Sequence, residues 1–389
     1  MTNPVVPKDF GFGPDEEMLR DLAHKFLAEQ MPIEKLRTLA APDPVPIYEE
    51  GQRPGWDEAV WKQIVELGWP SLAVPEAAGG TGFSFVGVVG LVEEVGRHAL
   101  PSPLIASLNA SLVLREADRE RAGPWLARLA DGASTSLAIT NSRGSWTAED
   151  SEVRATSTSE GLRLDGTSYF VQDAFKSDLF VVAAREGETL RLCVVPRESA
   201  GLTLEQDQIL DLTRDQATLR FEGVTVPEAA VVCEDAAAAL RRAWPALLCV
   251  VSADLCGTSE WQLQTTVEYA KSRKQFERQL GFFQAVKHPL VDAMIDIDRA
   301  RSLLYHAASL VDAGHPDALN AARMAKSAAS DAGAYVSGRS VQLHGGIGFT
   351  WECDIHLFFK RSLHNQTLYG DGVHQRRHLA DALIGPIAS

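Results

Sequence analysis

A change in hydrophobic period, which occurs twice along the chain, limits the possible folds more than any other feature. Between residues 133 and 235, apolar and polar residues alternate in short runs separated by turn residues, for example at 180–184 and 190–195. On either side, apolar residues recur at helical spacing. The sequence therefore predicts an α+β, mostly helical chain with a helical domain (1–132), a small β-barrel or sandwich (133–235) and a helical bundle (236–389).

Helical segments can be placed on both sides of this β domain. We expect one amphipathic helix over 14–40, a proline-rich break over 41–55 and a second helix over 56–67. The C-terminal part predicts helices at 236–272, 284–312, 316–342, 352–367 and 372–384. Long helices joined by short connections are expected to pack as an antiparallel four-helix bundle.

Charge and cysteine content exclude several classes of protein. The 389 residues carry a net charge of −15, which argues against nucleic acid or an anionic membrane as a partner. The five cysteines are scattered without a CxxC pair, so neither a disulfide framework nor a zinc site is indicated. The longest apolar run, 244–251, is too short to cross a membrane, and the N-terminus lacks a signal-peptide pattern. We expect a soluble, cytoplasmic protein.

Two stretches of the C-terminal part carry motifs. The first, YAKSRKQFERQLGFFQAVKHPL at 269–290, places Arg273 and Phe276 three residues apart, which predicts a shared helix face. The second, QLHGGIGFTWECDIHLFFKR at 342–361, contains closely spaced glycines that let a backbone approach a flat ligand. A glycine turn that merely ends a helix would explain the second stretch alone.

Together these stretches resemble the acyl-CoA dehydrogenase family, through the patterns SRKQF…FFQAVKH and QLHGGIGFTWE.D.HLF.KR. The segments at 68–84 and 210–232 are similar to that family as well, so the resemblance covers nearly the whole chain. It implies FAD as the cofactor, an acyl-CoA as the substrate and an electron-transferring flavoprotein as the electron acceptor. It also implies a helical domain, a small β domain and a four-helix bundle.

The resemblance assigns a role to each motif residue. In the family these two stretches grip the ADP half of FAD across a subunit interface. By that analogy Arg273 pairs with the pyrophosphate, where a planar guanidinium suits the oxygens, and Phe276 and Gln284 lie along the cofactor. Gln342 with Gly345 and Gly346 would hold the far end.

The flavin-ring side departs from the family pattern. A glycine-rich segment becomes TNSRGSW at 140–146, which keeps Thr140 but introduces Arg143, expected to intrude on the ring. A tryptophan-x-threonine pattern becomes Phe170-Val171-Gln172, which keeps an aromatic residue and a polar residue at the same spacing. The resemblance therefore implies that Thr140, Phe170 and Gln172 face the flavin ring.

The catalytic base also departs from the pattern. Removal of the substrate α-proton needs a carboxylate, which the family supplies as a glutamate at one of two places. Those places are occupied here by Gly370 and Leu247. Asp371, one position late and one methylene short, is the candidate base, although an aspartate before Gly372 is more often a loop or cap residue. Asp254, on the helix face of Leu247, is more often a structural acid at such a position.

His374 and His378 lie four residues apart near Asp371, but a solvated helix face is the better interpretation and no metal is expected.

Three hypotheses about the function follow from these observations. The resemblance implies that some bacterial members, notably those acting on steroid side chains, are α2β2 assemblies in which one kind of chain supplies the base. The first reading is such a partner subunit. The second is a homomeric dehydrogenase that uses Asp371, and the third is a flavin- or CoA-binding scaffold without chemistry.

Overall fold

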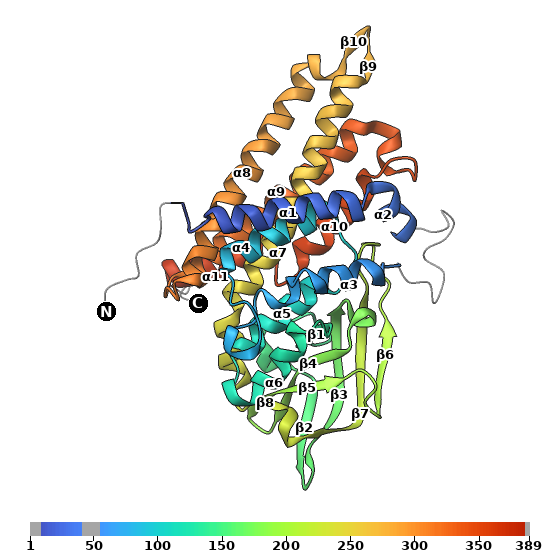
Figure 1. Cartoon of the computed structure of the whole chain (residues 1–389). Helices are drawn as coiled ribbons and strands as arrows, with labels where there is room; N and C mark the ends of the chain where they lie inside the picture. Colours follow the sequence, from blue (N-terminus) through green and yellow to red (C-terminus); the bar gives the residue numbers. More distant parts are fainter. Residues whose placement is uncertain (1–8, 41–54, 386–389) are drawn as a thin grey trace.

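The computed structural model describes residues 9–40 and 55–385, and most of the predicted proline-rich break at 41–55 lies outside these residues. Figure 1 shows an N-terminal group of helices beside a bundle of longer helices, with a sheet packed beneath both. This order of a helical part, a sheet and a helical bundle confirms the predicted fold class.

The N-terminal helices differ from the prediction in one place. They are α1 (Pro14–Gln30), α2 (Ile33–Ala40), α3 (Glu58–Glu66), α4 (Phe85–Arg97), α5 (Leu104–Arg115) and α6 (Arg119–Ala130). The expected single helix over 14–40 is wrong, because Met31 leaves the helical region with φ −134° and ψ 56° and Pro32 follows it. The next helix begins after Asp57, whose carboxylate accepts hydrogen bonds from the backbone N–H groups of Ala59 and Val60.

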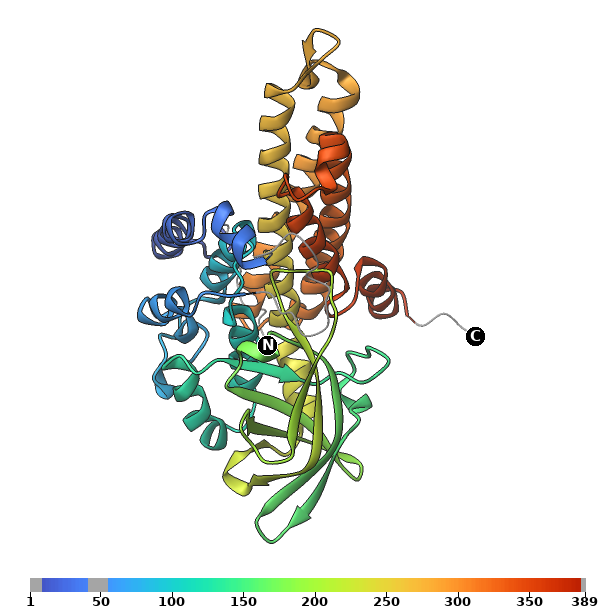
Figure 2. The ribbon, with the colours of Figure 1, turned by 90° about the vertical axis from the view of Figure 1, so that its right-hand side faces the viewer.

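The middle part is one mixed, eight-stranded sheet with the order β6-β7-β3-β2-β4-β5-β8, in which β1 pairs with β4 in parallel. Its strands are β1 (Thr135–Ala138), β2 (Val153–Thr158), β3 (Gly161–Gln172), β4 (Leu179–Glu186), β5 (Thr189–Pro196), β6 (Leu202–Gln206), β7 (Gln216–Pro227) and β8 (Val231–Cys233). Figure 2 shows these strands curving below the bundle. The first six residues of β4 are buried on both faces, so this strand joins the sheet core to the helices.

The C-terminal part is the predicted bundle. Its helices are α7 (Ala236–Ser272), α8 (Gln284–Asp312), α9 (Ala318–His344), α10 (Ile355–Thr367) and α11 (Gly372–Leu383), and a two-stranded hairpin of β9 (Lys274–Gln275) and β10 (Arg278–Gln279) joins α7 to α8. The predicted bounds agree within three residues. α7 is long and apolar enough to cross a membrane, but 72% of its most apolar window is buried inside the chain, as in the core helix of a bundle.

Candidate functional site

Three of the predicted cofactor residues lie at the exposed tip where α7 ends and α8 begins (Figure 1). Arg273 is the C-cap of α7, and Gln284 is the first residue of α8. Phe276 lies in the turn of the hairpin with φ +51° and is 87% exposed. Because α7 ends before Phe276, the predicted shared helix face of Arg273 and Phe276 is wrong. The exposed Phe276 ring is available to contact another molecule.

The other predicted cofactor residues lie at the C-terminal end of α9. Gln342 is exposed in the last turn, and Gly345 has φ +64°. A Cβ atom on Gly345 or Gly346 would meet nothing within 4 Å, so packing within the described chain does not explain Gly346. Tyr269 of α7 stacks on His344 of α9 with 4.3 Å between ring centroids, which brings both motifs to the same end of the bundle.

The predicted flavin-ring residues come together at a different place, where the sheet meets the bundle. Thr140, Phe170 and Gln172 line a cavity of about 20 Å³ with Trp146 and Tyr369. This volume holds about one water molecule, so the isoalloxazine ring does not fit. The Trp146 and Tyr369 rings pack edge to face with 5.0 Å between centroids. The exposed motif residues are open to a cofactor, whereas the cavity at Thr140, Phe170 and Gln172 is too small for an isoalloxazine ring.

The bulky side chain that narrows this cavity is Trp146 and not Arg143, which the sequence predicted. Arg143, predicted to intrude on the ring, is exposed, and its backbone N–H donates to the Asn141 side chain. Trp146, three residues later, lines the cavity instead.

Both polar atoms of the Gln172 side chain are hydrogen-bonded to groups of this chain. Its Nε2 donates to the Phe170 carbonyl at 3.0 Å and to Gln216 Oε1 at 2.8 Å. Its Oε1 accepts from Nε2 of His364 at 2.6 Å. Burial lowers the pKa of His364 to about 4, so this imidazole is neutral at pH 7. Groups of this chain therefore use both amide N–H donors of Gln172 and one of the two acceptor positions on its oxygen.

At Gly370, which occupies the expected position of the glutamate, the backbone has φ +88°. A Cβ built there would lie 2.2 Å from Cδ2 of His374, far inside van der Waals contact. The His374 imidazole thus occupies the space that the Cβ atom of any side chain at residue 370 would need. A base at this position needs both a strained backbone and a displaced histidine.

Asp371 caps the following helix. Its Oδ1 accepts a hydrogen bond from the backbone N–H of His374 at 2.8 Å, which satisfies one of the free donors at the start of α11. Nε2 of His374 lies 3.2 Å from Nε2 of His378. Among residues 9–40 and 55–385, no group of three metal-ligating side chains occurs.

Two substitutions of Asp371 separate its capping role from a role as base. Asparagine caps as well as aspartate, so Asp371→Asn should leave the free energy of unfolding unchanged, and Asp371→Ala should lower it by about 1 kcal/mol. Neither substitution is expected to reduce turnover of an acyl-CoA. Chemical denaturation and a steady-state assay measure the two effects. Loss of turnover in Asp371→Asn, with stability unchanged, would make Asp371 the base.

The other acid considered from the sequence, Asp254, belongs to a buried ion network. Its carboxylate accepts two hydrogen bonds from Arg361, each 2.9 Å long, and a further one from Arg214. Burial by itself raises the pKa of Asp254, but the charges of Arg361 and Arg214 outweigh it, so the pKa lies below its ordinary value. Since α7 carries Asp254 and the segment before β7 carries Arg214, this network fixes the sheet to the bundle.

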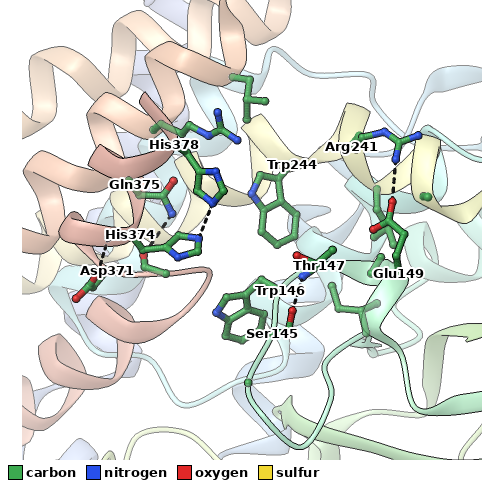
Figure 3. Close-up of a pocket in the computed structure, with 18 of the residues that line it drawn as sticks. Ser145, Trp146, Thr147, Glu149, Arg241, Trp244, Asp371, His374, Gln375 and His378 are labelled. Carbon is green, nitrogen blue, oxygen red and sulfur yellow. Dashed lines mark hydrogen bonds and ion pairs between the residues drawn. The ribbon is translucent and has the colours of Figure 1, made fainter. Parts of the chain in front are cut away.

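A larger cavity, of about 640 Å³, opens beside Gly370 and Asp371 (Figure 3). It lies between the loop 144–149, the first turns of α7 and α9, and α11. Trp146 and Trp244 project into it, and Arg241 pairs with Glu149 at 2.9 Å across one side. Its size is typical of a site for a small organic molecule.

Sequence reasoning missed Trp244 and Arg323, which both line this cavity. In the sequence, Trp244 is the first residue of the apolar run 244–251, which gives no sign of a cavity. The one signal for Arg323 is its position in NAARMAKSAAS, where an arginine stands among alanines and serines on a helix that packs in the bundle.

Comparison with known proteins supports a single family. The model of the acyl-CoA dehydrogenase N-terminal domain matches residues 13–133, and that of the C-terminal domain matches residues 249–384. The chain is 32% identical over 349 residues to the acyl-CoA dehydrogenase IpdE2 of Mycobacterium tuberculosis, covering 90% of this chain and 91% of that protein.

Solved structures agree with this. The ChsE4-ChsE5 complex from Mycobacterium tuberculosis superposes with a TM-score of 0.86 at 25% identity, covering 98% of this chain and 100% of that one. A variant of the Tcur3481-Tcur3483 steroid ACAD superposes with a TM-score of 0.84 at 27% identity, covering 96% of this chain and 98% of that one.

Proposed function

Because this chain belongs to the acyl-CoA dehydrogenase family, we propose that it is the subunit without a base in a mixed α2β2 dehydrogenase. The assembly introduces a double bond between the α and β carbons of an acyl-CoA thioester. FAD is the cofactor of this family and, when bound, accepts the hydride from the β-carbon. Likeness to the two-component ChsE4-ChsE5 complex supports a related chain as the partner.

The observation that carries this proposal is the contrast between the two halves of the FAD site. Arg273, Phe276 and Gln284 are exposed at the tip of α7 and α8, where they can reach the FAD of a neighbouring subunit. In contrast, the ring pocket of this chain has about 20 Å³ and is lined by Trp146 and Tyr369. A chain that contacts the ADP half of a neighbour's FAD, but has no space for an isoalloxazine ring itself, needs a different chain to complete the FAD site.

In this account each exposed residue has a definite task. Arg273 holds the pyrophosphate with a planar, permanently charged group, and Phe276 covers the cofactor from water. Gln342 and the open backbone at Gly345 and Gly346 hold the far end of the neighbour's FAD. The partner chain supplies the carboxylate that removes the α-proton, because Gly370 and Leu247 of this chain supply none.

A steroid or similarly bulky acyl group is the substrate we propose, because one similar structure is named as a steroid ACAD. An electron-transferring flavoprotein in the cytoplasm is the proposed electron acceptor.

Restoring the glutamate should not create an active chain. Gly370→Glu is expected to show no flavin bleaching by acyl-CoA when the chain is alone, because the ring pocket stays filled. It should also lower the free energy of unfolding by more than the roughly 1–2 kcal/mol of a left-handed backbone, since the new side chain meets His374. Gly79→Glu is the matched control, because Gly79 has φ +84° and open space at its Cβ. Equal losses of stability in both variants would contradict the contact with His374.

The proposed function is tested by comparing the activity of this chain alone with its activity in complex with a related chain. The chain alone should not oxidise an acyl-CoA, and co-purification with a related chain that carries the glutamate should produce turnover. Turnover by the chain alone at the rate of the mixture would favour the homomeric reading. If no related chain produces turnover and no thioester bleaches a bound flavin, the scaffold reading would be favoured.

A further inference from the structure

Lys326, in the first half of α9, is a completely buried lysine. Its Nζ donates hydrogen bonds to the Ser330 hydroxyl at 2.8 Å and to the backbone carbonyl of Gln366 at 2.9 Å. It forms no ion pair with residues 9–40 or 55–385. An ammonium group has three N–H donors and an uncharged amine has two, which equals the number of acceptors in this part of the chain. The site therefore suits a lysine that carries no charge.

Two acids, Asp371 and Asp331, lie close enough to Lys326 for their charges to favour its ammonium form. Both are engaged elsewhere. Nη1 of Arg376 donates to Asp331 at 2.6 Å, and Asp371 accepts from the backbone N–H of His374 at 2.8 Å (Figure 3). Burial outweighs the two charges and lowers the pKa of Lys326 to about 7.

The other titratable groups on the neighbouring helices offer Lys326 no free negative charge. α10 contains no acid, and its His364 is uncharged at pH 7. On α9, Arg323 lies one turn before Lys326 and carries the same charge as an ammonium group. On α7, the Asp254 carboxylate is bound by Arg361. A proton on Lys326 thus places a buried charge without a partner in the bundle, which costs free energy.

The Gln366 carbonyl that Lys326 binds belongs to the last turn of α10, directly before the α10–α11 turn (367–371). Tyr369 in this turn has φ +56°, a left-handed backbone that a residue with a Cβ atom seldom adopts. Gln375 of α11 holds the other side of the turn, because its Nε2 donates to the Tyr369 carbonyl at 2.6 Å. Lys326 and Gln375 therefore support, from both sides, a strained turn that places Tyr369 in the ring pocket.

We propose that Lys326 is a positioning residue that holds the α10–α11 turn as an uncharged amine, and that uptake of a proton by this amine loosens the turn. Opening of the turn gives the ammonium group access to water, which removes the cost of the buried charge. The turn is then tight in alkaline solution and looser below neutral pH. The inference deepens the proposed function, on which it rests only for the role of the ring pocket that Tyr369 helps to close.

The direction of the pH dependence follows from the two states of the turn. The pKa of Lys326 is about 7 when the turn is closed, and a lysine exposed to water has a pKa of about 10.4. Between these two values the open state binds one proton more than the closed state. The equilibrium constant for opening should therefore fall as pH rises above about 7, by up to about tenfold for each pH unit. Below about 7 both states bind the proton, and the constant should stay level.

Hydrogen exchange of the full chain, within the mixed assembly if the chain is insoluble alone, tests this between pH 6 and pH 9. Peptides that cover 364–372 are analysed by mass spectrometry, and the rates are corrected for the intrinsic pH dependence of amide exchange. From pH 7 to pH 9 the opening constant of the wild-type segment should fall by roughly 10- to 100-fold. Lys326→Met and Lys326→Gln take up no proton, so their corrected constants should not change with pH. Lys271→Met, at an exposed lysine of α7, is the matched control and should keep the wild-type dependence.

Peptides from α4 separate opening of the turn from unfolding of the whole chain, because their corrected constants should not follow pH in this way. A pH dependence of equal size in α4 and in 364–372 would overturn the proposal. So would a dependence that both uncharged variants retain, and a level wild-type profile would overturn it without any variant. Hydrogen exchange is measured without flavin or substrate, so failure of the mixed-assembly proposal would leave these results unchanged.

Discussion

Asp254→Asn is expected to lower the free energy of unfolding by about 3–5 kcal/mol, because removing one partner of a buried ion pair leaves the other charges uncompensated. Asparagine keeps one acceptor oxygen and places an NH2 donor at the other position, so fully buried Arg361 would lose one of its two 2.9 Å bonds and the negative charge that balances its own. Arg214 would lose the same balancing charge, and also its hydrogen bond if the amide nitrogen takes the Oδ2 position. Since these residues join the sheet segment to α7 and α10, the loss should appear as a lower midpoint in chemical denaturation.

The control for this substitution is Glu205→Gln. Glu205 pairs with Arg220 on the surface at 2.8 Å, where water and salt screen the charges, so the midpoint should not change. A small effect of Asp254→Asn, similar to that of the control, would show that the buried network does not hold the sheet to the bundle.

The network also sets a pH dependence. The pKa of Asp254 is lower in the folded chain than its ordinary value of about 3.9, so its stabilising contribution is complete above that value. The contribution should be lost as pH falls below about 3.9, because the unfolded chain then binds the proton more readily. The difference in denaturation midpoint between the wild-type chain and Asp254→Asn should therefore be constant from pH 6 to about pH 4 and become smaller towards pH 3. A difference in midpoint that stays constant down to pH 3 would contradict the lowered pKa of Asp254.

Arg273→Ala is expected to weaken FAD binding in the mixed assembly by roughly 10- to 100-fold, the effect of losing a hydrogen bond between charged groups. The side chain is exposed at the tip of α7, so stability should be unchanged. Flavin retained after gel filtration, read from visible absorbance, measures the effect.

Lys271→Ala is the matched control for Arg273→Ala, because Lys271 is exposed two residues earlier and pairs with Glu268 on the same helix, at 2.6 Å. It should retain its flavin. Equal retention in both variants would show that Arg273 does not hold the pyrophosphate.

Much of the architecture could be predicted from the sequence because it depends on local pattern. The bounds of α7, α8 and α11 follow from helical spacing and from turn residues, and the structure agrees with them within three residues. The family could likewise be identified from contiguous motifs. The helix expected over 14–40 was wrong because spacing alone did not weigh Pro32, which follows the break at Met31.

The state of the ring pocket could not be predicted in the same way. It depends on Trp146, Phe170 and Tyr369, which come from distant segments and meet only in the folded chain. The contact between residue 370 and His374 depends on a backbone with φ +88°, which the sequence does not reveal beyond the presence of a glycine. The prediction that Arg143 intrudes failed because its side chain turns to solvent, and Trp146 fills the space.

The flavin content of the chain, purified alone and then together with a related chain that carries the glutamate, tests the central claim most directly. We expect almost no flavin with the chain alone, because its ring pocket has about 20 Å³. Together with the partner we expect one flavin for each pair of chains, held by the partner's ring pocket and this chain's Arg273. One flavin per chain in the absence of a partner would contradict the account and return the search for the base to Asp371.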